Sequence, residues 1–219
     1  MIAYDVVIFD CDGVLVDSER LVSRLEAGLI SNLGLPIDEE QARVMFKSKT
    51  IAQTAQLIEQ QLGRPLPAAW VYDWGFEVAA LFERELKAVP GVMDVVQALA
   101  QANVPLCVAS QSPAERIALS LNVTGLATYF RERMYSASMV KCPKPAPDLF
   151  LFAAAQMATD PSRCVVIEDS PSGVIGARAA GMDVFGYAGD EDAQALAAAG
   201  ATVFNSMSEL PPLLGLRPS

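Results

Sequence analysis

The feature that most constrains the fold is a short apolar run that ends in two closely spaced acids. Val6 to Phe9 contains no polar residue and is rich in β-branched and aromatic side chains. A run without alternation suits a strand buried on both faces, as in the parallel sheet of an α/β protein. Asp10, Asp12 and Gly13 follow directly. Because ligands of such sheets bind outside the carboxyl ends of the strands, this stretch predicts a site as well as a fold.

The spacing of the two acids restricts their chemistry. Side chains two residues apart on an extended segment share a face, so Asp10 and Asp12 can serve one site. One carboxylate can act as a nucleophile and the other as an acid or base, with a cation offsetting their like charge. Gly13 allows a sharp turn or a close approach to a ligand. The alternative is a strand end with two solvated acids.

Residues 16–88 show helical periodicity and no convincing strand. A first helix, with Asp17 or Ser18 as N-cap and Gly34 at its end, is predicted by one apolar stripe: Leu21, Val22, Leu25, Leu29 and Leu33. Asp38 and Gln41 form a capping box for a short second helix. Apolar stripes predict two further helices, over residues 51–62 and 71–82.

Beyond Pro90 strands alternate with helices. Strands are predicted at 105–109, 134–135, 164–167, 183–187 and 201–204, and helices at 92–99, 113–121, 147–157, 171–180 and 191–199. This alternation implies right-handed crossovers and a parallel sheet. The helical block is too long for a crossover. We therefore predict an α/β core of residues 1–15 and 89–219 with an inserted α-helical cap of residues 16–88, hinged near 14–17 and 88–90.

Composition excludes several classes of function. The 219 residues are 52% hydrophobic and 19% charged, which predicts a packed globular protein. A formal net charge of −10 argues against a nucleic-acid or anionic-membrane surface. The chain has no histidine, which excludes a Ser-His-Asp triad, a Cys-His pair, a phosphohistidine and a His-ligated zinc site. Carboxylates, lysine, serine and hard metals remain.

The cysteines and the absence of targeting signals predict a cytoplasmic protein. Cys11, Cys107, Cys142 and Cys164 form no C-x-x-C pair, and three of them lie in or beside predicted core strands. They are therefore expected to be reduced thiols, mostly buried. No apolar run is long enough to span a bilayer, and we see no signal peptide.

Ser110 and Lys144 are candidates for binding an anion. The Ser110 hydroxyl, at the end of the strand 105–109, could hold a phosphate oxygen; the alternative is that Ser110 or Ser112 caps the next helix. Lys144 precedes Pro145 and Pro147 and so sits on a rigid turn, where it could offset charge on a nucleophile and a phosphoryl group. The alternative is a solvated surface lysine. Lys141 is a nearby rival without the proline context.

Glu168 and Asp169 end the strand 164–167 and bring two more acids to the same edge of the sheet. Together with Asp10 and Asp12 they would form an oxygen-rich site of the kind that suits Mg²⁺. The alternative is an N-cap cluster for the helix that starts at Pro171, with Asp169 or Ser170 as the cap.

Four segments, in order, resemble the four motifs of the haloacid dehalogenase (HAD) superfamily. They are Asp-x-Asp-Gly-Val-Leu-x-Asp from Asp10, the strand-end Ser110, Lys-Pro-x-Pro-Asp from Lys144, and Glu-Asp-Ser-x-x-Gly from Glu168. The resemblance covers the core from residue 6 to about residue 182. It implies a Rossmann-like parallel-sheet HAD core, and the helical insert resembles the cap of the β-phosphoglucomutase-like subgroup.

The resemblance assigns roles to these residues. It implies that Asp10 attacks phosphorus to form an aspartyl-phosphate, and that Asp12 protonates the leaving oxygen and then activates water. Ser110 and Lys144 would bind the phosphoryl oxygens, with Gln111 beside them in substrate binding. This suits phosphoryl transfer, which depends on positioning and on neutralising spread charge.

The resemblance also implies Mg²⁺ as cofactor. Its ligands would be Asp10, the backbone carbonyl of Asp12, and Asp169, with Glu168 helping directly or through water. Asp12 separates the chain from the dehalogenases, which resemble this motif but lack the second Asp. No cap lysine is placed to suggest a phosphonoacetaldehyde hydrolase.

Cap residues bear on the substrate. Lys47 and Lys49 fall where the subgroup keeps its specificity loop, and could meet a second anionic group such as a sugar-acid carboxylate, or be solvated. The pattern is most similar to bacterial 6-phosphogluconate phosphatases. We therefore predict a phosphatase for a small phosphorylated metabolite, either a sugar phosphate or a sugar-acid phosphate such as 6-phosphogluconate, acting as a monomer or weak homo-oligomer without nucleic-acid or membrane partners.

Two alternatives stay open. A β-phosphoglucomutase-type mutase would carry a cap histidine where this chain reads Arg20-Leu21-Val22. A receiver-like signalling module also has strand-end acids, Mg²⁺ and a lysine. Asp12 argues against it, because a second Asp speeds loss of the phosphoryl group.

Overall fold

The chain divides into two compact units. The computed structural model describes residues 3–46, 49–189 and 192–216. One unit comprises Met1–Val16 and Ala88–Ser219, and the other comprises Asp17–Lys87; we call them the α/β unit and the helical unit. The boundaries expected from the sequence, after residue 15 and before residue 89, differ from this division by one residue. Within the α/β unit, Val16 and Ala88 pair in an antiparallel bridge where the chain leaves and returns.

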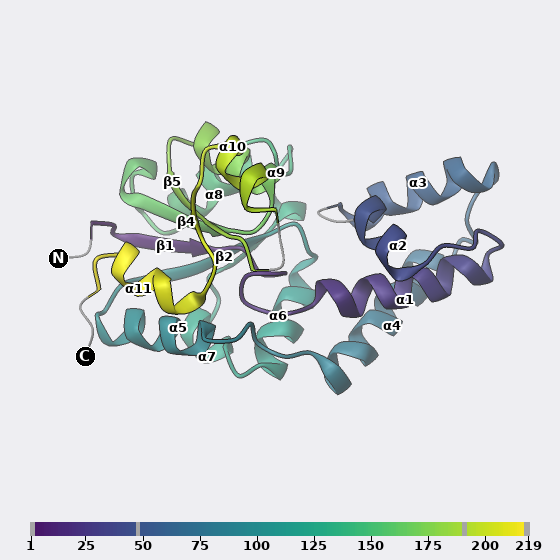
Figure 1. Ribbon diagram of the computed structural model, residues 1–219, viewed down its shortest axis with the longest axis horizontal. Helices are drawn as coiled ribbons and strands as arrows, with labels where there is room; N and C mark the ends of the chain where they lie inside the picture. Colours follow the sequence, from purple (N-terminus) through teal and green to yellow (C-terminus); the bar gives the residue numbers. More distant parts are fainter. Residues whose placement is uncertain (1–2, 47–48, 190–191, 217–219) are drawn as a thin grey trace. The chain divides into compact units, whose positions relative to one another are not determined.

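Within the described residues, six parallel strands form the sheet of the α/β unit (Figure 1). They are β1 (Val6–Phe9), β2 (Leu106–Ser110), β3 (Met134–Ser136), β4 (Cys164–Glu168), β5 (Asp183–Tyr187) and β6 (Thr202–Phe204). Their order in the sheet is β3-β2-β1-β4-β5-β6. All the strands predicted from apolar runs are therefore confirmed, and the first is central, with β2 on one side and β4 on the other.

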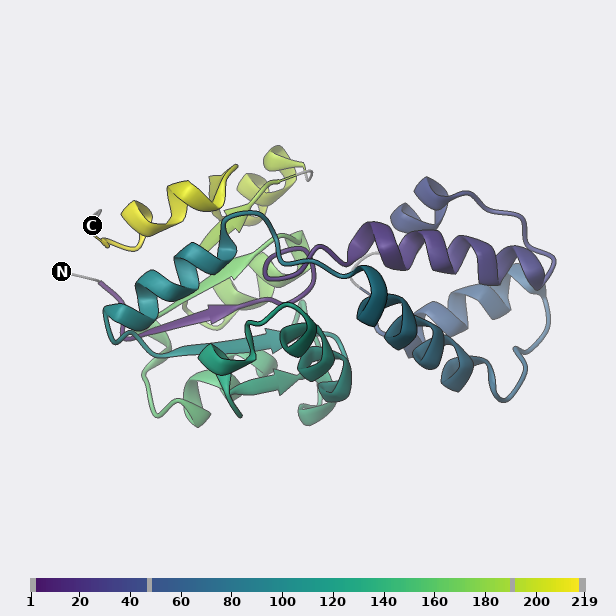
Figure 2. The same cartoon turned by 90° about the horizontal axis from the view of Figure 1, so that it is seen from below.

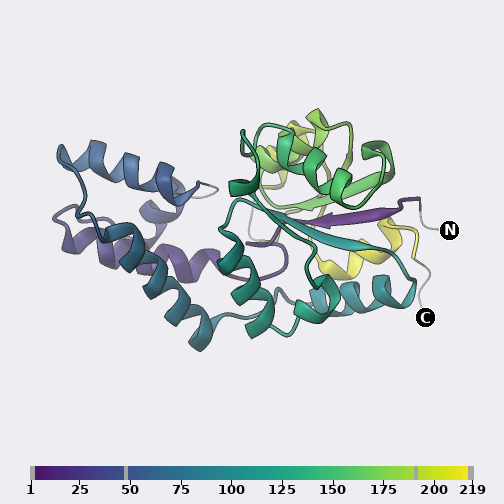
Figure 3. The same ribbon diagram turned by 180° about the vertical axis from the view of Figure 1, so that it is seen from behind.

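Helices cover both faces of this sheet. They are α5 (Val92–Gln101), α6 (Ala114–Val123), α7 (Ala127–Phe130), α8 (Asp148–Gln156), α9 (Pro171–Ala179), α10 (Ala193–Ala199) and α11 (Leu210–Leu213). Helices α8, α9 and α10 lie above the sheet in Figures 1 and 3, and α5, α7 and α11 lie below it, on the face turned toward the viewer in Figure 2. The short helices α7 and α11, and 3₁₀ turns at Ala137–Met139, Pro161–Arg163 and Met207–Glu209, were not predicted.

The central strand is buried on both faces, as its uninterrupted apolar run predicts. Val6 and Ile8 pack in a cluster with Phe150 of α8 and Val174 of α9. On the opposite face Phe9 meets Phe130 of α7 edge to face, with ring centroids 6.0 Å apart. Burial of apolar area on both sides anchors β1 and so fixes the acids that follow it.

The described residues of the helical unit form four helices, in the places that the apolar stripes predict. They are α1 (Glu19–Asn32), α2 (Glu39–Phe46), α3 (Ile51–Leu62) and α4 (Trp70–Glu85). The predicted capping box is present, since Asp38 and Gln41 each accept a hydrogen bond from the other's backbone N–H at 2.8 and 2.9 Å. None of the helices in the described part of the chain is long and apolar enough to cross a membrane.

The apolar stripe that predicts α1 is not the face that α1 buries. The leucine stripe is only partly buried, and the residues of α1 that are buried are Ser23, Glu26 and Ile30. This face is rotated from the leucine stripe by roughly one residue step around the axis. The Ser23 hydroxyl donates to the Glu19 carbonyl at 2.8 Å, so its burial leaves no unmet bond. The enclosed face depends on where α2 and α4 pack against α1, which periodicity does not encode.

Candidate active site

Three neighbouring strands deliver polar side chains to one edge of the sheet. Asp10 follows β1, Ser110 ends β2, and Glu168 and Asp169 end and follow β4. Strand order reverses here, because the chain runs from β1 through β2 to β3 on one side and continues from β4 to β6 on the other. Such a switch point at the carboxyl ends of parallel strands is where ligands of open α/β sheets bind. The structure therefore brings together residues that lie more than 150 positions apart in the sequence.

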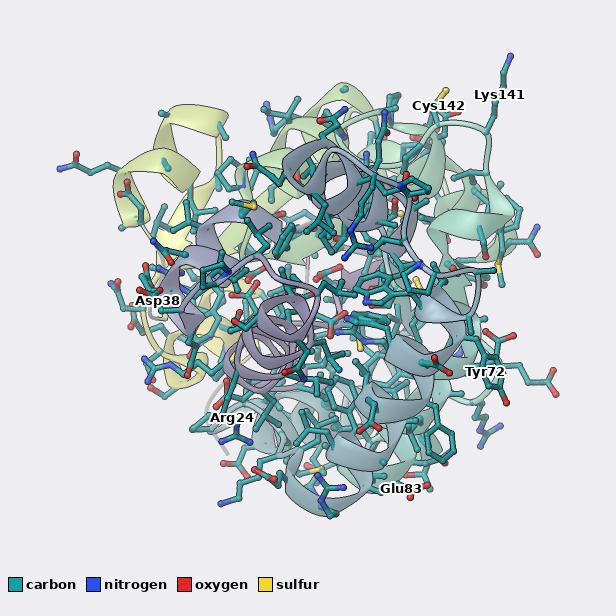
Figure 4. The ribbon with its side chains drawn as sticks, turned by 90° about the vertical axis from the view of Figure 1, so that its right-hand side faces the viewer. Arg24, Asp38, Tyr72, Glu83, Lys141 and Cys142 are labelled. Carbon is teal, nitrogen blue, oxygen red and sulfur yellow. The ribbon has the colours of Figure 1, made fainter. Side chains whose placement is uncertain are left out.

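Lys144 is the cation at the centre of this cluster. Its Nζ lies 2.6 Å from Asp10 Oδ1, 2.6 Å from Glu168 Oε1 and 2.8 Å from the Ala109 carbonyl oxygen. The side chain is only 1% exposed, and Nζ also lies 5.0 Å from the centroid of the Phe150 ring. A solvated surface lysine is thus excluded for Lys144. The rival Lys141 is exposed and projects away from the ribbon (Figure 4).

The burial of these charges alters their proton affinities. Burial raises the pKa of Asp10 from its ordinary 3.8 to about 7, although the neighbouring charge of Lys144 acts in the opposite direction. For Lys144 burial acts to lower the pKa, but Asp10 and Glu168 outweigh it and hold the pKa above its usual range. Lys144 is therefore protonated at neutral pH, and it is the group that favours an ionised Asp10.

Glu168 organises the loop after β4. Its Oε2 accepts hydrogen bonds from the backbone N–H of Asp169 at 3.0 Å, the backbone N–H of Ser170 at 2.9 Å and the Ser170 hydroxyl at 2.9 Å. Ser170 in turn caps α9, because its Oγ accepts from the Gly173 N–H at 3.1 Å. Of the two predicted caps it is Ser170 that fills the position. Asp169 is left with its carboxylate directed to the site.

Two glycines of the predicted motifs make room for these carboxylates. A Cβ atom on Gly13 would collide with the Asp169 carboxylate, and one on Gly173 would collide with that of Glu168. Gly13 also has φ = +80°, a backbone conformation that other residues adopt only with strain. The glycine after the two acids is therefore required for both its turn and the close approach of Asp169.

The acidic cluster fits a divalent cation. Asp10, Glu168 and Asp169 each offer a carboxylate oxygen within 4.8 Å of the others, and all three residues are buried. In the ion pairs that the described residues show here, Lys144 meets Asp10 and Glu168, and Arg116 meets Asp12, so acids outnumber cations in these pairs. Excess negative charge in a buried, oxygen-rich place is neutralised well by a hard cation such as Mg²⁺. The structure therefore contains a group of acids that could hold a metal.

Asp12 lies in a separate polar contact. Ser112 Oγ donates to Asp12 Oδ2 at 2.6 Å, and Arg116 donates to Oδ1 at 2.9 Å. Sequence reasoning missed both partners. Ser112 offered a weak signal, because it lies two residues after Ser110 and so could share its face. Arg116 offered none, since its place in the first turns of α6 brings it to Asp12 only after folding.

The loop after β2 is tied to the rest of the site. Ser110 is buried, and its Oγ accepts from the Ser112 N–H at 3.1 Å. Gln111, predicted to bind substrate, donates through Nε2 to the Lys144 carbonyl at 3.3 Å and so links two of the motif loops. Ser136 Oγ donates to the Ser112 carbonyl at 2.8 Å from the next strand.

The two predicted cap lysines have different outcomes. Lys47 lies outside the described residues. Lys49 is exposed and belongs to the helical unit, just before α3. Its role in substrate binding stays a prediction.

The α/β unit thus presents a buried carboxylate beside a lysine, further acids suited to a metal, serine hydroxyls, and a second carboxylate with its own donors. This set can bind an oxyanion, stabilise added negative charge and transfer a proton. Phosphoryl transfer requires all three.

Comparison with known proteins agrees with this chemistry. A family model described as haloacid dehalogenase-like hydrolase matches residues 4–181. The 6-phosphogluconate phosphatase of Escherichia coli (strain K12) is 31% identical over 212 residues, which cover 95% of this chain and 94% of that protein. The fructose-1-phosphate phosphatase of the same strain is 31% identical over 180 residues, with 82% and 94% covered. A solved HAD family hydrolase from Deinococcus radiodurans, with bound phosphate and sodium, is 33% identical, with a TM-score of 0.80 and 100% of both chains covered.

Proposed function

The chain belongs to the haloacid dehalogenase-like hydrolases, and from that membership we propose that it is a Mg²⁺-dependent phosphatase of small phosphorylated metabolites. The observation that carries the proposal is the buried group of Asp10, Lys144, Glu168 and Asp169 at the switch point of the sheet. A buried carboxylate paired with a lysine, beside further acids, is a costly arrangement for stability alone. It suits a nucleophile that must accept a phosphoryl group.

In the first half of the proposed reaction, Asp10 attacks the phosphorus of the substrate. A bond forms between a carboxylate oxygen of Asp10 and phosphorus, and the bond between phosphorus and the ester oxygen breaks. Asp12 gives its proton to that leaving oxygen, and the alcohol departs. Lys144 and Ser110 hold oxygens of the transferring group, so that its spread charge faces donors fixed before the reaction begins.

The second half restores the enzyme. A water molecule attacks the phosphorus of the aspartyl-phosphate and gives a proton to Asp12, phosphate forms, and Asp10 leaves as a carboxylate. Asp10 and Asp169, with the backbone carbonyl of Asp12, would hold Mg²⁺, which supplies positive charge to the phosphoryl oxygens when bound. Because Glu168 Oε1 accepts a hydrogen bond from Lys144 and Oε2 accepts three from Asp169 and Ser170, we propose that Glu168 acts mainly by holding Lys144 and the Asp169 loop.

The substrate class follows from the relatives. The two phosphatases named above act on 6-phosphogluconate and fructose 1-phosphate, and both are 31% identical to this chain. The identity, which extends over 95% of this chain for the first relative and 82% for the second, supports a sugar phosphate or sugar-acid phosphate as substrate. We propose that the helical unit is the cap that selects the substrate, with Lys47 and Lys49 meeting the carboxylate of a sugar acid.

A mutase is the second candidate, because Asp10 and Asp12 would serve its phosphoryl transfers equally well. The chain has no histidine to take the cap position of a β-phosphoglucomutase, which favours the phosphatase. A receiver-like module is disfavoured because Asp12 would speed the loss of its phosphoryl group.

We further propose that the enzyme acts in the cytoplasm as a monomer or weak homo-oligomer. The support for a reducing compartment is that its cysteines are free thiols, three of them buried and Cys142 exposed. Elution from a size-exclusion column over a range of protein concentrations would give the oligomeric state.

The test is phosphate release from a panel of sugar phosphates and sugar-acid phosphates, with Mg²⁺ and with EDTA, for the wild type and Asp10→Asn. We expect release that needs the metal and falls at least about 10³-fold in Asp10→Asn, because the amide cannot attack phosphorus. Interconversion of phosphosugar isomers in place of release would favour the mutase. No turnover of any compound by folded, Mg²⁺-bound protein would contradict the phosphatase.

A further inference from the structure

The contacts of Asp12 point to one more functional residue. We propose that Arg116 is a positioning residue, which holds the Asp12 carboxylate in the orientation needed to pass its proton to the leaving oxygen. The inference rests on the proposed function, since Asp12 exchanges a proton in this way only if phosphoryl transfer takes place.

Each oxygen of the Asp12 carboxylate has its own donor. Arg116 donates to Oδ1 at 2.9 Å and Ser112 Oγ donates to Oδ2 at 2.6 Å. A carboxylate bonded at one oxygen can turn about its Cβ–Cγ bond, whereas one bonded at both has its plane fixed. Charge-assisted hydrogen bonds of this kind are also the stronger ones. Removing Arg116 therefore takes away the charged donor at Oδ1 while leaving the Ser112 bond to Oδ2 in place.

Both donors belong to one braced segment of the chain. Ser112 and Arg116 lie in the connection from β2 into the first turns of α6, and the Arg116 N–H donates to the Pro113 carbonyl at 3.0 Å. The fully buried Ser136 holds the same segment through its bond to the Ser112 carbonyl. This segment begins at Ser110, the proposed phosphoryl ligand. Arg116 thus fixes Asp12 relative to the place where the phosphoryl group would be held.

The Arg116–Asp12 pair differs from the other arginine ion pairs described in the α/β unit. Its side chains are 18% and 21% exposed, whereas those of Arg163 and Asp5 are 52% and 54% exposed. Exposed pairs contribute little to stability and fix little geometry. Arg163 therefore offers a matched control, an arginine of the same unit paired with an aspartate that is not part of the proposed site.

The test compares two substrates with different leaving groups. The first is the sugar phosphate that the wild type hydrolyses best, whose alkoxide must be protonated as it leaves. The second is p-nitrophenyl phosphate, whose phenolate leaves without a proton. The measured quantity is kcat/KM, because it covers the steps up to cleavage of the ester bond and excludes hydrolysis of the aspartyl-phosphate.

We expect Arg116→Met to lower kcat/KM for the sugar phosphate by about 10- to 100-fold, part of what a general acid contributes. For p-nitrophenyl phosphate the change should stay within about threefold, since no proton is delivered. Arg116→Lys, which keeps one donor and the charge, should recover part of the loss. Arg163→Met should leave both values unchanged.

An equal fall for both substrates, or no fall for either, would overturn the inference. A second check uses Asp12→Asn as background, where adding Arg116→Met should cause no further loss if Arg116 acts through Asp12. A further loss there would mean that Arg116 acts on the substrate itself. Thermal unfolding of each variant verifies the fold. If Arg116→Met does not fold, kcat/KM for the two substrates is compared in Arg116→Lys and Ser112→Ala instead.

The two proposals fail differently. A wild type that releases no phosphate contradicts the phosphatase, whereas an active wild type with an unaltered Arg116→Met contradicts only the role of Arg116.

Discussion

One ion pair from each unit shows how differently the same contact can be placed. In the α/β unit, Lys144 and Glu168 are each 1% exposed at their side chains and lie 2.6 Å apart. In the helical unit the Arg24–Glu85 pair has the same 2.6 Å separation, but its side chains are 54% and 42% exposed. The same contact distance thus belongs to a buried group in one unit and to a solvated surface in the other.

The surfaces of the two units differ as well. Helix α4 exposes 78% of Tyr72 and 65% of Phe76, and Figure 4 shows Tyr72 at the outer side of that helix. Of the proposed catalytic residues of the α/β unit, Asp10, Ser110 and Lys144 are instead buried. Rigid scaffolds hold chemistry in place, while exposed segments vary and select ligands. The proposed division of labour, in which the α/β unit carries out the reaction and the helical unit selects the substrate, is tested by changes made in each unit.

The largest expected difference between the units is in stability. Lys144→Met leaves Asp10 and Glu168 buried without their cation, and we expect a loss of about 3–5 kcal/mol in unfolding free energy, together with loss of activity. Arg24→Met, the matched control in the helical unit, should leave stability unchanged within error because its pair is solvated. Denaturant unfolding in EDTA measures both. Equal effects would mean that the buried and exposed pairs do not differ.

The next effect is in the pH dependence of stability without metal. Because burial raises the pKa of Asp10 from its ordinary 3.8 to about 7, the folded state holds this proton more tightly than the unfolded state. The stability that Asp10 contributes is then present below about pH 4 and lost as the pH rises through about 7. Asp10→Asn lacks this titration. In EDTA, the Tm of Asp10→Asn relative to that of the wild type should therefore rise as the pH increases from about 4 to about 7.

Asp5 provides the opposite sign in the same unit. Its bond to Arg163 lowers the pKa of Asp5, so that its contribution is present at neutral pH and lost as the pH falls through its folded pKa. Asp5→Asn should therefore show only a small Tm deficit at neutral pH, because its pair is solvated, and this deficit should disappear in acid. A Tm difference for Asp10→Asn that does not vary with pH would contradict the raised pKa of Asp10.

The smallest expected effect lies in the helical unit and concerns substrate choice. If Lys49 meets the carboxylate of a sugar acid, Lys49→Ala should raise KM for 6-phosphogluconate about three- to tenfold, as expected for one exposed charge contact. KM for fructose 1-phosphate and kcat for both should stay unchanged. Arg84→Ala, which removes the same charge from an exposed position of α4, is the control. A loss of kcat in Lys49→Ala would contradict the division of labour between the units.

Much of the α/β unit could be predicted because its signals are local. The apolar run of β1, the prolines after Lys144 and the glycine after Asp12 each restrict the backbone conformation of the few residues around them. Parallel strands then bring their carboxyl ends to one edge, which placed Asp10, Ser110, Glu168 and Asp169 together before any contact was known. The predicted family, fold class and enzyme class are confirmed, whereas the catalytic roles of individual residues stay predictions.

The sequence by itself determined the strands, the four helices of the insert and the acids at the edge of the sheet, since each depends on neighbours along the chain. Only the tertiary structure decided which face of α1 is enclosed, that Lys144 joins Asp10 to Glu168, and that Arg116 reaches Asp12. These contacts join segments up to 134 positions apart, such as Asp10 and Lys144. Packing chooses among several partners that local patterns allow, and no periodicity records that choice.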